Sequence, residues 1–420
     1  MGEVRVLSVY EGFFSGGARI LHSDVVRGLH GAAQRHAVLS MRGQVRREAT
    51  LQRMEDDACY RSLTAAGVPV SALGGAGGDG PGAFDAADLA ATARATAAAD
   101  VVLSLKEQPL ALLNHPGLPY RPVVACLHRS DPYGQGPALD ALLAGIAAGR
   151  VRACVCCAES TREAYAAAGV PAGLLHVIPN GVDLLRFRPD PAARARVRQR
   201  YGIAADAPVV VFAARWAAMK DVPLFLRAAA RYLRSEPGAR VLMCGAGMTA
   251  ANPELAAAID AAFGGRPGAA WLSLLGVRPD MEAVYAAADV VALTSHSGEA
   301  APLCLIEGMM CGAVPVTTDV GDSASLVAGR GLVTPADPDV IAAAWAEAVA
   351  MAGARRDGGP GGPAGAFSDS GASGPSERSR PGGVADPGRE RFSRERMIAA
   401  YAALIEQVHG GVAAAPVASA

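Results

Sequence analysis

Short apolar runs alternate with alanine-rich or amphipathic stretches along most of the 420 residues. Runs such as 4–10 (VRVLSVY) and 208–213 (PVVVFA) have the length and β-branched content of strands buried on both faces. Stretches of helical length, such as 222–234 and 251–263, lie between such runs. This alternation predicts parallel sheets covered by helices on both faces. The other predicted strands are 36–41, 100–105, 122–127, 152–157, 240–244, 271–275, 288–293 and 313–317.

Two interruptions divide this pattern. The stretch 178–191 carries Asn-Gly and three prolines and is typical of a connection, after which a charged helix is expected at 193–201. The stretch 353–388 is rich in Gly, Pro, Ser and charge, and its apolar content is too low to offset the entropy of ordering, so we expect a disordered insertion. Helical spacing returns in 389–409, at Phe392, Met397, Tyr401, Leu404 and Val408.

These features predict three parts. The first is an N-terminal Rossmann-like domain over 1–185. The second is a C-terminal Rossmann-like domain over 186–388, which includes the insertion. The third is a helix over 389–410 that packs back toward the N-terminal domain. Domain closure over a cleft is expected, with 180–207 and the terminal helix as hinge candidates.

Composition excludes several classes of protein. The net charge of −1 gives no global basic field for nucleic acid. No run of about twenty apolar residues predicts a membrane span, and the first residues predict a strand rather than a signal peptide. Cys154, Cys156 and Cys157 lack zinc-site spacing and are expected as buried thiols, so we expect a cytoplasmic protein.

Basic residues gather between Arg42 and Leu63, at Arg42, Arg46, Arg47 and Arg53. A helix that contacts a membrane surface is one interpretation of this stretch. Acidic residues are interspersed among the arginines, so the stretch predicts a solvated helix, and peripheral membrane contact is not favoured.

The segment 288–316 carries the most chemistry. A buried strand ends near Thr294, a loop follows, and an apolar helix starts near Pro302. Ligands of doubly wound sheets bind beyond the carboxyl ends of strands, and a helix N-terminus attracts anions. Glu299 lies in the loop and Glu307 inside the helix. Because a buried carboxylate needs a partner, the two hydroxyls of a ribose would suit Glu307.

An E-x7-E spacing at a helix start, followed by Gly312, Pro315 and the turn 318–321 (Thr-Asp-Val-Gly), resembles family 4 of the retaining GT-B glycosyltransferases. The resemblance covers about 4–350 and the terminal helix, and is tighter in the second half of the chain. It implies the GT-B fold, an α/β fold of two facing Rossmann-like domains with a cleft between them and a C-terminal helix that crosses back. It also implies that Glu299 faces the donor sugar and Glu307 the nucleotide ribose.

Arg215 and Lys220 follow the strand 208–213 and resemble the Gly-Arg…Lys-Gly element of the family, with Ala214 and Asp221 in place of its glycines. A nucleotide diphosphate leaves with two negative charges, which cations must neutralise where no metal does so. Arginine offers a fork to phosphate oxygens and lysine a point charge. A surface pair on a helix is the alternative interpretation.

The resemblance assigns further positions at the cleft. Gly16 and Gly17 would border the diphosphate and the acceptor, although a plain tight turn explains them as well. His128 ends the strand 122–127 and would contact the donor sugar, with a structural histidine as the alternative. Backbone groups of Gly276 and Val277 would hold the base. The remaining candidates are Ala300, Ala301, Pro302 and Leu303 on the donor side, and Lys106 and Asn180 on the acceptor side.

The predicted function is therefore retaining transfer of a glycosyl group from a nucleotide-diphosphate sugar to a small-molecule acceptor. His128, Arg215, Lys220 and Glu299 form the predicted catalytic set, and neither a metal nor another cofactor is expected. The setting would be bacterial specialised metabolism or a thiol pathway. Ala300 and Ala301 depart from the bulkier Gly-Phe common in the family, which predicts an unusual sugar pocket.

Other functions fit the same architecture. A sugar-nucleotide epimerase would convert its substrate without an acceptor, and a non-catalytic two-lobed protein would only bind a ligand. A phosphorylase would need a motif for a cofactor lysine that we do not find. A nicotinamide oxidoreductase is disfavoured because the chain lacks the G-x-G-x-x-G fingerprint at its first strand. Nucleotide release that depends on an added acceptor separates glycosyl transfer from these alternatives.

Overall fold

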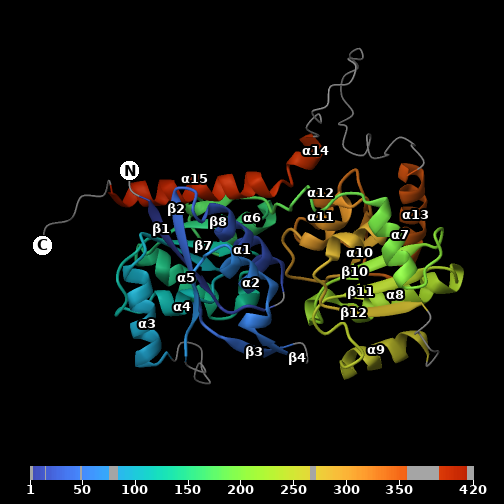
Figure 1. Ribbon diagram of the computed structural model, residues 1–420, viewed down its shortest axis with the longest axis horizontal. Coiled ribbons are helices and arrows are strands. Elements are labelled where there is room, and N and C mark those ends of the chain that lie inside the picture. Colours follow the sequence, from blue (N-terminus) through green and yellow to red (C-terminus); the bar gives the residue numbers. More distant parts are fainter. Residues whose placement is uncertain are drawn as a thin grey trace, which may run out of the picture.

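The computed structural model describes residues 3–14, 16–47, 50–74, 84–264, 271–356 and 387–413, which form two α/β lobes side by side (Figure 1). The N-terminal lobe contains a seven-stranded parallel sheet in the order β5-β2-β1-β6-β7-β8-β9. Its strands are β1 (Val4–Tyr10), β2 (Gln34–Ser40), β5 (Val70–Ala72), β6 (Val101–Leu105), β7 (Val123–Leu127), β8 (Val151–Cys156) and β9 (Leu175–Val177). Its main helices are α1 (Gly17–Leu29), α2 (Ala58–Ala65), α3 (Ala86–Ala97), α4 (Leu110–Leu113), α5 (Ala138–Ala147) and α6 (Glu159–Ala167).

The C-terminal lobe contains a six-stranded parallel sheet in the order β12-β11-β10-β13-β14-β15. Its strands are β10 (Val209–Ala213), β11 (Arg240–Cys244), β12 (Leu272–Gly276), β13 (Val290–Leu293), β14 (Val314–Thr318) and β15 (Leu332–Thr334). Its helices are α7 (Pro191–Arg200), α8 (Val222–Ser235), α9 (Pro253–Phe263), α10 (Met281–Ala287), α11 (Leu303–Met310), α12 (Ser323–Val327) and α13 (Pro338–Arg356). Phe225 packs between Phe212 and Trp345 in the core, with ring centroids 4.4 and 5.2 Å apart.

The chain crosses between the lobes twice, and the two crossings lie side by side. The first follows β9, and the second joins α14 (Pro387–Glu390) to α15 (Arg394–Ala413). Val182 donates its N–H to the Phe392 carbonyl at 2.8 Å, and Arg394 donates its N–H back to the Val182 carbonyl at 3.0 Å. A Cβ on Gly181 would lie 2.4 Å from the Ser393 carbonyl oxygen, so this approach of two backbones requires glycine.

The helix α15 starts at the boundary between the lobes and runs along the N-terminal lobe, away from the lobe that precedes it in the chain (Figure 1). Five of its apolar side chains are buried against the N-terminal sheet: Met397, Tyr401, Leu404, Ile405 and Val408. They share a cluster with residues of β1, β6, β7 and β8. The predicted fold class, two Rossmann-like parallel sheets with helices, is confirmed.

The expected helix within Arg42 to Leu63 is wrong over most of its length. Residues there form an antiparallel hairpin of β3 (Gln44–Arg47) and β4 (Thr50–Arg53), a short 3-10 turn follows at Met54–Asp56, and only α2 is an α-helix as expected. Exposed Arg42, Gln44 and Arg46 alternate with half-buried Gly43 and Val45, which is the period of a strand. The cluster of arginines was interpreted as part of a solvated helix, whereas the period of two in burial is that of a strand.

The expected disordered insertion at 353–388 is wrong at both ends. Helix α13 continues to Arg356 because Ala352 is buried in the core and Arg355 donates to the Arg330 carbonyl at 2.9 Å. Helix α14 already begins at Pro387. Residues 357–386 lie outside the described part of the chain.

Phe392 does not lie on the terminal helix as expected. It sits in the turn between α14 and α15 and packs into the C-terminal core, whereas Met397 and Tyr401 pack into the N-terminal lobe. All eight cysteines are unpaired thiols, and Cys154, Cys156 and Cys157 are buried as expected. None of the described helices is long and apolar enough to cross a membrane.

Candidate active site

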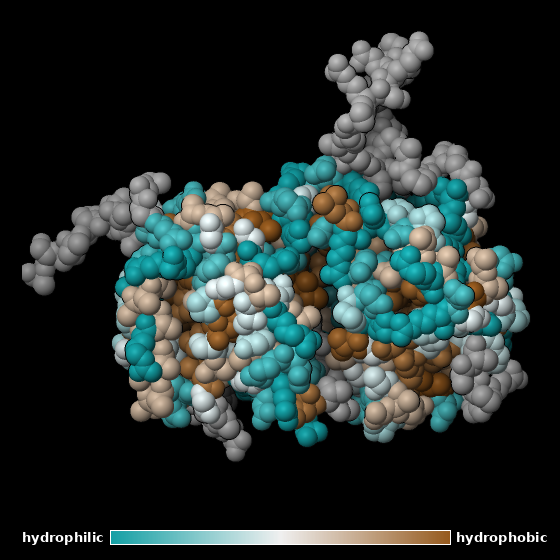
Figure 2. Space-filling model, in the orientation of Figure 1, coloured by the Kyte–Doolittle hydropathy of each residue, from teal (hydrophilic) through white to brown (hydrophobic). Residues whose placement is uncertain are grey.

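A cleft of about 340 Å³ lies between the lobes, at the carboxyl ends of strands from both sheets. Figure 2 shows the hollow that separates the two lobes on one face of the molecule. The loops after β1, β6 and β7 line one wall, and the loops after β10, β11, β12 and β13 line the other. The structure brings all but one of the predicted site residues to this cleft: Gly16, Gly17, Lys106, His128, Asn180, Arg215, Lys220, Val277, Glu299, Ala300, Ala301, Pro302, Leu303 and Glu307. Gly276 ends β12 just before Val277 and does not line the cleft itself.

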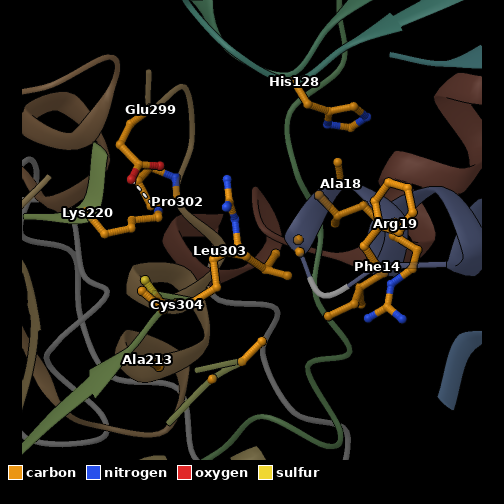
Figure 3. A pocket seen from close by; sticks show the side chains of 18 of the residues that line it. Phe14, Ala18, Arg19, His128, Ala213, Lys220, Glu299, Pro302, Leu303 and Cys304 are labelled. Carbon is orange, nitrogen blue, oxygen red and sulfur yellow. Dashed lines mark hydrogen bonds and ion pairs between the residues drawn. The ribbon is translucent and has the colours of Figure 1, made fainter. Parts of the chain in front are cut away.

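Glu299 is held by two donors on the C-terminal wall. Lys220, at the end of a short 3-10 turn after β10, forms an ion pair with one carboxylate oxygen of Glu299 (Figure 3). The Ser295 hydroxyl donates to the same oxygen at 2.5 Å. The two charged side chains are only 15% and 8% exposed, so the pair is largely shielded from solvent. The loop thus presents a carboxylate with a fixed orientation and a neutralised charge.

Two glycines shape the backbone around Glu299. Gly321 has a φ of +61°, and a Cβ there would lie 2.4 Å from the Glu299 carbonyl oxygen. Gly298 has a φ of +68°, and a Cβ there would lie 2.5 Å from a guanidinium nitrogen of Arg129 in the opposite lobe. The Thr318 hydroxyl supports the same loop by donating to the Ser295 carbonyl at 2.5 Å. The Thr-Asp-Val-Gly turn therefore packs against the Glu299 loop and supports its backbone.

Glu307 lies on α11 and is 9% exposed at the cleft wall. Burial raises the pKa of this carboxyl to about 7, partly offset by a hydrogen bond with the Tyr285 hydroxyl. The partner that a buried carboxylate requires is thus found within the protein. The assignment of a ribose to Glu307 stays a prediction.

The departures from the Gly-Arg…Lys-Gly element have a structural explanation. Asp221 adopts a left-handed conformation with φ of +42°, which aspartate tolerates better than most residues. Its carboxylate accepts from the Leu224 N–H at 3.0 Å and caps α8. Gly245 shapes the neighbouring turn, because a Cβ there would lie 2.0 Å from the Ala214 carbonyl oxygen. The strand-to-helix connection that carries Arg215 and Lys220 is therefore well defined without the two glycines.

The N-terminal wall presents His128, which faces the Glu299 and Lys220 pair across the cavity (Figure 3). Burial lowers the pKa of its imidazole to about 3, with a smaller contribution from Lys106, so the ring is neutral near pH 7. Its Nε2 is buried and has no hydrogen-bond partner among the described residues. A neutral imidazole with an unsatisfied nitrogen at a cleft wall is suited to bind a hydroxyl group.

Asn180 spans the cleft rather than lining only the acceptor side. Its side-chain amide donates to the Ala301 carbonyl of the opposite lobe at 2.8 Å. The N-terminal wall also carries Arg19, which is paired with Asp57, and Arg129, which the sequence analysis did not select. Arg129 directly follows His128, so its position in the chain could have revealed it.

Ser295 and Tyr285 are two further residues that the sequence analysis missed. Ser295 precedes Glu299 by four residues within the same loop, whereas nothing in the spacing relates Tyr285 to Glu307. Among the residues that the structure describes, no group of three His, Cys, Asp or Glu side chains is arranged to hold a metal ion.

Both halves of the chain match known family models. Residues 16–186 match the model described as "Glycosyltransferase Family 4", and residues 207–351 match "Glycosyl transferases group 1". A D-inositol 3-phosphate glycosyltransferase of Nocardia farcinica is 33% identical over 176 residues, which are 40% of this chain and 38% of the relative. A GDP-mannose-dependent alpha-(1-6)-phosphatidylinositol monomannoside mannosyltransferase of Mycolicibacterium smegmatis is 41% identical over 87 residues, 21% of this chain and 22% of the relative. The matched stretches thus span less than half the length of these relatives.

Solved structures match the chain over nearly its whole length. The crystal structure of Anabaena Alr3699/HepE in complex with UDP gives a TM-score of 0.72 at 20% identity, over 96% of this chain and 100% of that one. The fold is GT-B. A sucrose-phosphate synthase from Thermosynechococcus elongatus gives a TM-score of 0.67 at 16% identity, over 97% and 100% of the two chains. In this GT-B chain the two glycosyltransferase models fall on the two lobes that enclose the cleft.

Proposed function

We propose that this GT-B protein is a retaining glycosyltransferase that moves a sugar from a nucleotide-diphosphate donor to a small-molecule acceptor. One observation carries the proposal. Arg215, Lys220 and the N-terminus of α11 meet on one wall of the cleft, beside Glu299. Cations and free helix amides are the groups that stabilise a departing diphosphate. The match of both halves of the chain to glycosyltransferase models supports the same reaction class.

We place the donor along the C-terminal wall. Val277, which is 66% exposed at the cleft, offers apolar surface to the base, and Glu307 offers its carboxylate to the ribose. The diphosphate would lie against Arg215 and Lys220, and the sugar beside Glu299 and Ala300. This order follows the arrangement of the loops after β12, β10 and β13.

In the proposed reaction, the bond from the anomeric carbon to the diphosphate oxygen breaks, and the acceptor oxygen bonds to that carbon on the same face. The departing phosphate oxygen takes the acceptor proton. Lys220 would turn from Glu299 to the phosphate as charge develops there, while Arg215 binds bidentately. His128, as a neutral imidazole, would hold a sugar hydroxyl. Glu299 is engaged by Lys220 and Ser295, so we assign it sugar binding rather than nucleophilic attack.

The acceptor side favours an anionic molecule. Lys106 and Arg129 bring two cationic side chains to the N-terminal wall, where the charge of Arg19 is already paired with Asp57. One relative is named for a polyol phosphate, D-inositol 3-phosphate. We therefore propose a small hydroxylated acceptor that carries a phosphate or carboxylate group.

The test begins with thermal shift against UDP, GDP, ADP and dTDP, followed by nucleotide release from the matching sugar donors. A polyol phosphate and the uncharged polyol serve as paired acceptors, and NMR of the product reports the anomeric configuration. Release that requires the acceptor supports transfer, whereas conversion of the donor alone identifies an epimerase. If no nucleoside diphosphate stabilises the protein, the proposal fails.

A matched pair of variants tests whether Arg215 is a cation that stabilises the leaving diphosphate. Arg215→Met should reduce turnover roughly 100- to 1000-fold, as the loss of one charge-stabilising donor does. Arg227→Met removes the same charge from the exposed face of α8 and should leave turnover unchanged. Equal losses in both variants would show that Arg215 has no special role.

A further inference from the structure

The N-terminus of α6 in the N-terminal lobe is capped by a residue of the other lobe. Ala158 occupies the N-cap position and has no side chain that could accept from the first amides. The carboxylate of Asp322, in the C-terminal lobe, accepts from the Glu159 N–H at 3.0 Å and from the Ser160 N–H at 2.9 Å. These are two of the amides that a helix leaves without an internal partner.

Asp322 precedes α12 and occupies the N-cap position of that helix, but its side chain makes no cap there. It reaches across the lobe boundary instead. Its own N–H donates to the Ala300 carbonyl at 2.8 Å, next to Glu299. One residue therefore joins the Glu299 loop of one lobe to a helix end of the other.

The connection continues on the far side of the cleft. The Ser160 hydroxyl lies 2.7 Å from the Ser130 hydroxyl, and Ser130 follows His128 by two residues. A chain of hydrogen bonds thus runs from the Glu299 loop through Asp322 and Ser160 to the His128 loop.

Small side chains permit this close approach of the lobes. Ala300 and Ala301 pack against Cys157 and Ala158, the residues just before α6. A phenylalanine in place of Ala301, as in the Gly-Phe pair common in the family this chain resembles, would push the helix end away from Asp322.

We propose that Asp322 is a positioning residue that holds the two lobes closed, with His128 opposite Glu299. This role rests on the proposed transfer reaction. When the lobes part, the Asp322 carboxylate and both α6 amides return to water, so the interaction stabilises only the closed arrangement. A carboxylate at a helix N-terminus also interacts favourably with the helix dipole.

The test compares Asp322→Ala, Asp322→Asn and Glu159→Gln. Loss of a helix cap shifts an equilibrium roughly 5- to 30-fold, so Asp322→Ala should lose that much in kcat/KM. Asp322→Asn keeps one acceptor oxygen and should recover part of the loss. Nucleoside diphosphate affinity should stay within about twofold of wild type, because the donor lies on one lobe, whereas a general loss of structure would weaken it too.

Glu159→Gln is the matched control. It removes a negative charge from the same helix end but keeps the backbone N–H that donates a hydrogen bond to Asp322. The Glu159 side chain is 56% exposed. It should behave as wild type. An equal loss in this variant would overturn the role of the contact between the lobes.

Small-angle scattering gives a readout that does not depend on activity. The radius of gyration of Asp322→Ala should exceed that of wild type, with and without nucleoside diphosphate. If wild type shows no transfer but the variant still expands, the proposed function fails, whereas the closure of the lobes by Asp322 is supported. If wild type is active and Asp322→Ala keeps both its compactness and its kcat/KM, the positioning role is refuted.

Discussion

Glu307 should lower the stability of the ligand-free protein at neutral and alkaline pH. Its carboxyl is buried in α11, and burial raises its pKa from the ordinary 4.5 to about 7. The folded protein therefore keeps a proton at Glu307 between these two values, while the unfolded chain releases it. The Glu307 carboxyl has no effect on stability well below pH 4.5, lowers it progressively as the pH rises from 4.5 to 7, and has a constant effect above pH 7.

The size of the effect follows from the same two values. Each tenfold change in an acidity constant is worth about 1.4 kcal/mol, so the full loss is about 3 kcal/mol. Most of it develops between pH 5 and pH 8. Glu307→Gln keeps an acceptor for the Tyr285 hydroxyl and removes the titration. The variant should therefore gain about 2 to 3 kcal/mol over wild type between those two pH values.

Urea unfolding of both proteins at pH 5 and pH 8, without nucleotide, measures this difference. Glu107 and the buried histidines have displaced pKa values in both proteins, so their effects cancel in the comparison. Glu347→Gln removes an exposed carboxyl from α13 and serves as the matched control. If the gap between Glu307→Gln and wild type is equal at pH 5 and pH 8, the reasoning about burial is refuted.

Three further substitutions have defined outcomes. Lys220→Met should reduce turnover roughly 100-fold or more in a nucleotide-release assay, because Glu299 loses its ion-pair partner and the leaving phosphate loses a stabilising cation. Near-normal turnover would contradict both roles of Lys220. Asp289→Asn should destabilise the C-terminal lobe by about 3 to 5 kcal/mol in thermal unfolding, because three arginines share this carboxylate, which is 2% exposed; a small effect would show that the arginines find other acceptors. Gly321→Ala should reduce turnover at least tenfold through its clash with the Glu299 carbonyl, whereas Gly329→Ala, at a similar φ of +71° with open space around it, should cost only about 1 kcal/mol of stability and leave turnover intact.

The sequence predicts ten of the thirteen strands of the two sheets because their signal is local, and it misses the short edge strands β5, β9 and β15. β-branched runs such as Val209–Val211 have the period and length of buried parallel strands, and β10 and β13 lie within one or two residues of the predicted ranges. The hairpin β3–β4 was missed because the clustered charges were interpreted as a solvated helix, while the alternating burial that decides the structure depends on the partner strand. Local patterns thus predict strands that are buried on both faces better than strands with one exposed face, such as β3.

The same distinction applies to the candidate site. Residues after strand ends, such as His128 and Lys220, could be selected because parallel sheets place such positions at one edge. The contacts that hold the site could not be selected. Asp322 lies 163 residues from Glu159, and no periodicity relates a carboxylate in one lobe to a bare helix end in the other. Tyr285 likewise meets Glu307 only because α10 and α11 pack together.

The helix α15 has a consequence for how the protein is made. Its side chains, from Met397 to Val408, complete the core beneath β1 and β6, which are among the first strands to leave the ribosome. The N-terminal lobe therefore keeps an uncovered apolar face until the whole C-terminal lobe has been synthesised. Exposed apolar surface of this kind promotes aggregation. The nascent chain should therefore depend on a chaperone until α15 has been synthesised, although all strands of the N-terminal sheet are made much earlier. A stop codon before α15 would leave the first lobe, rather than the last, incompletely folded.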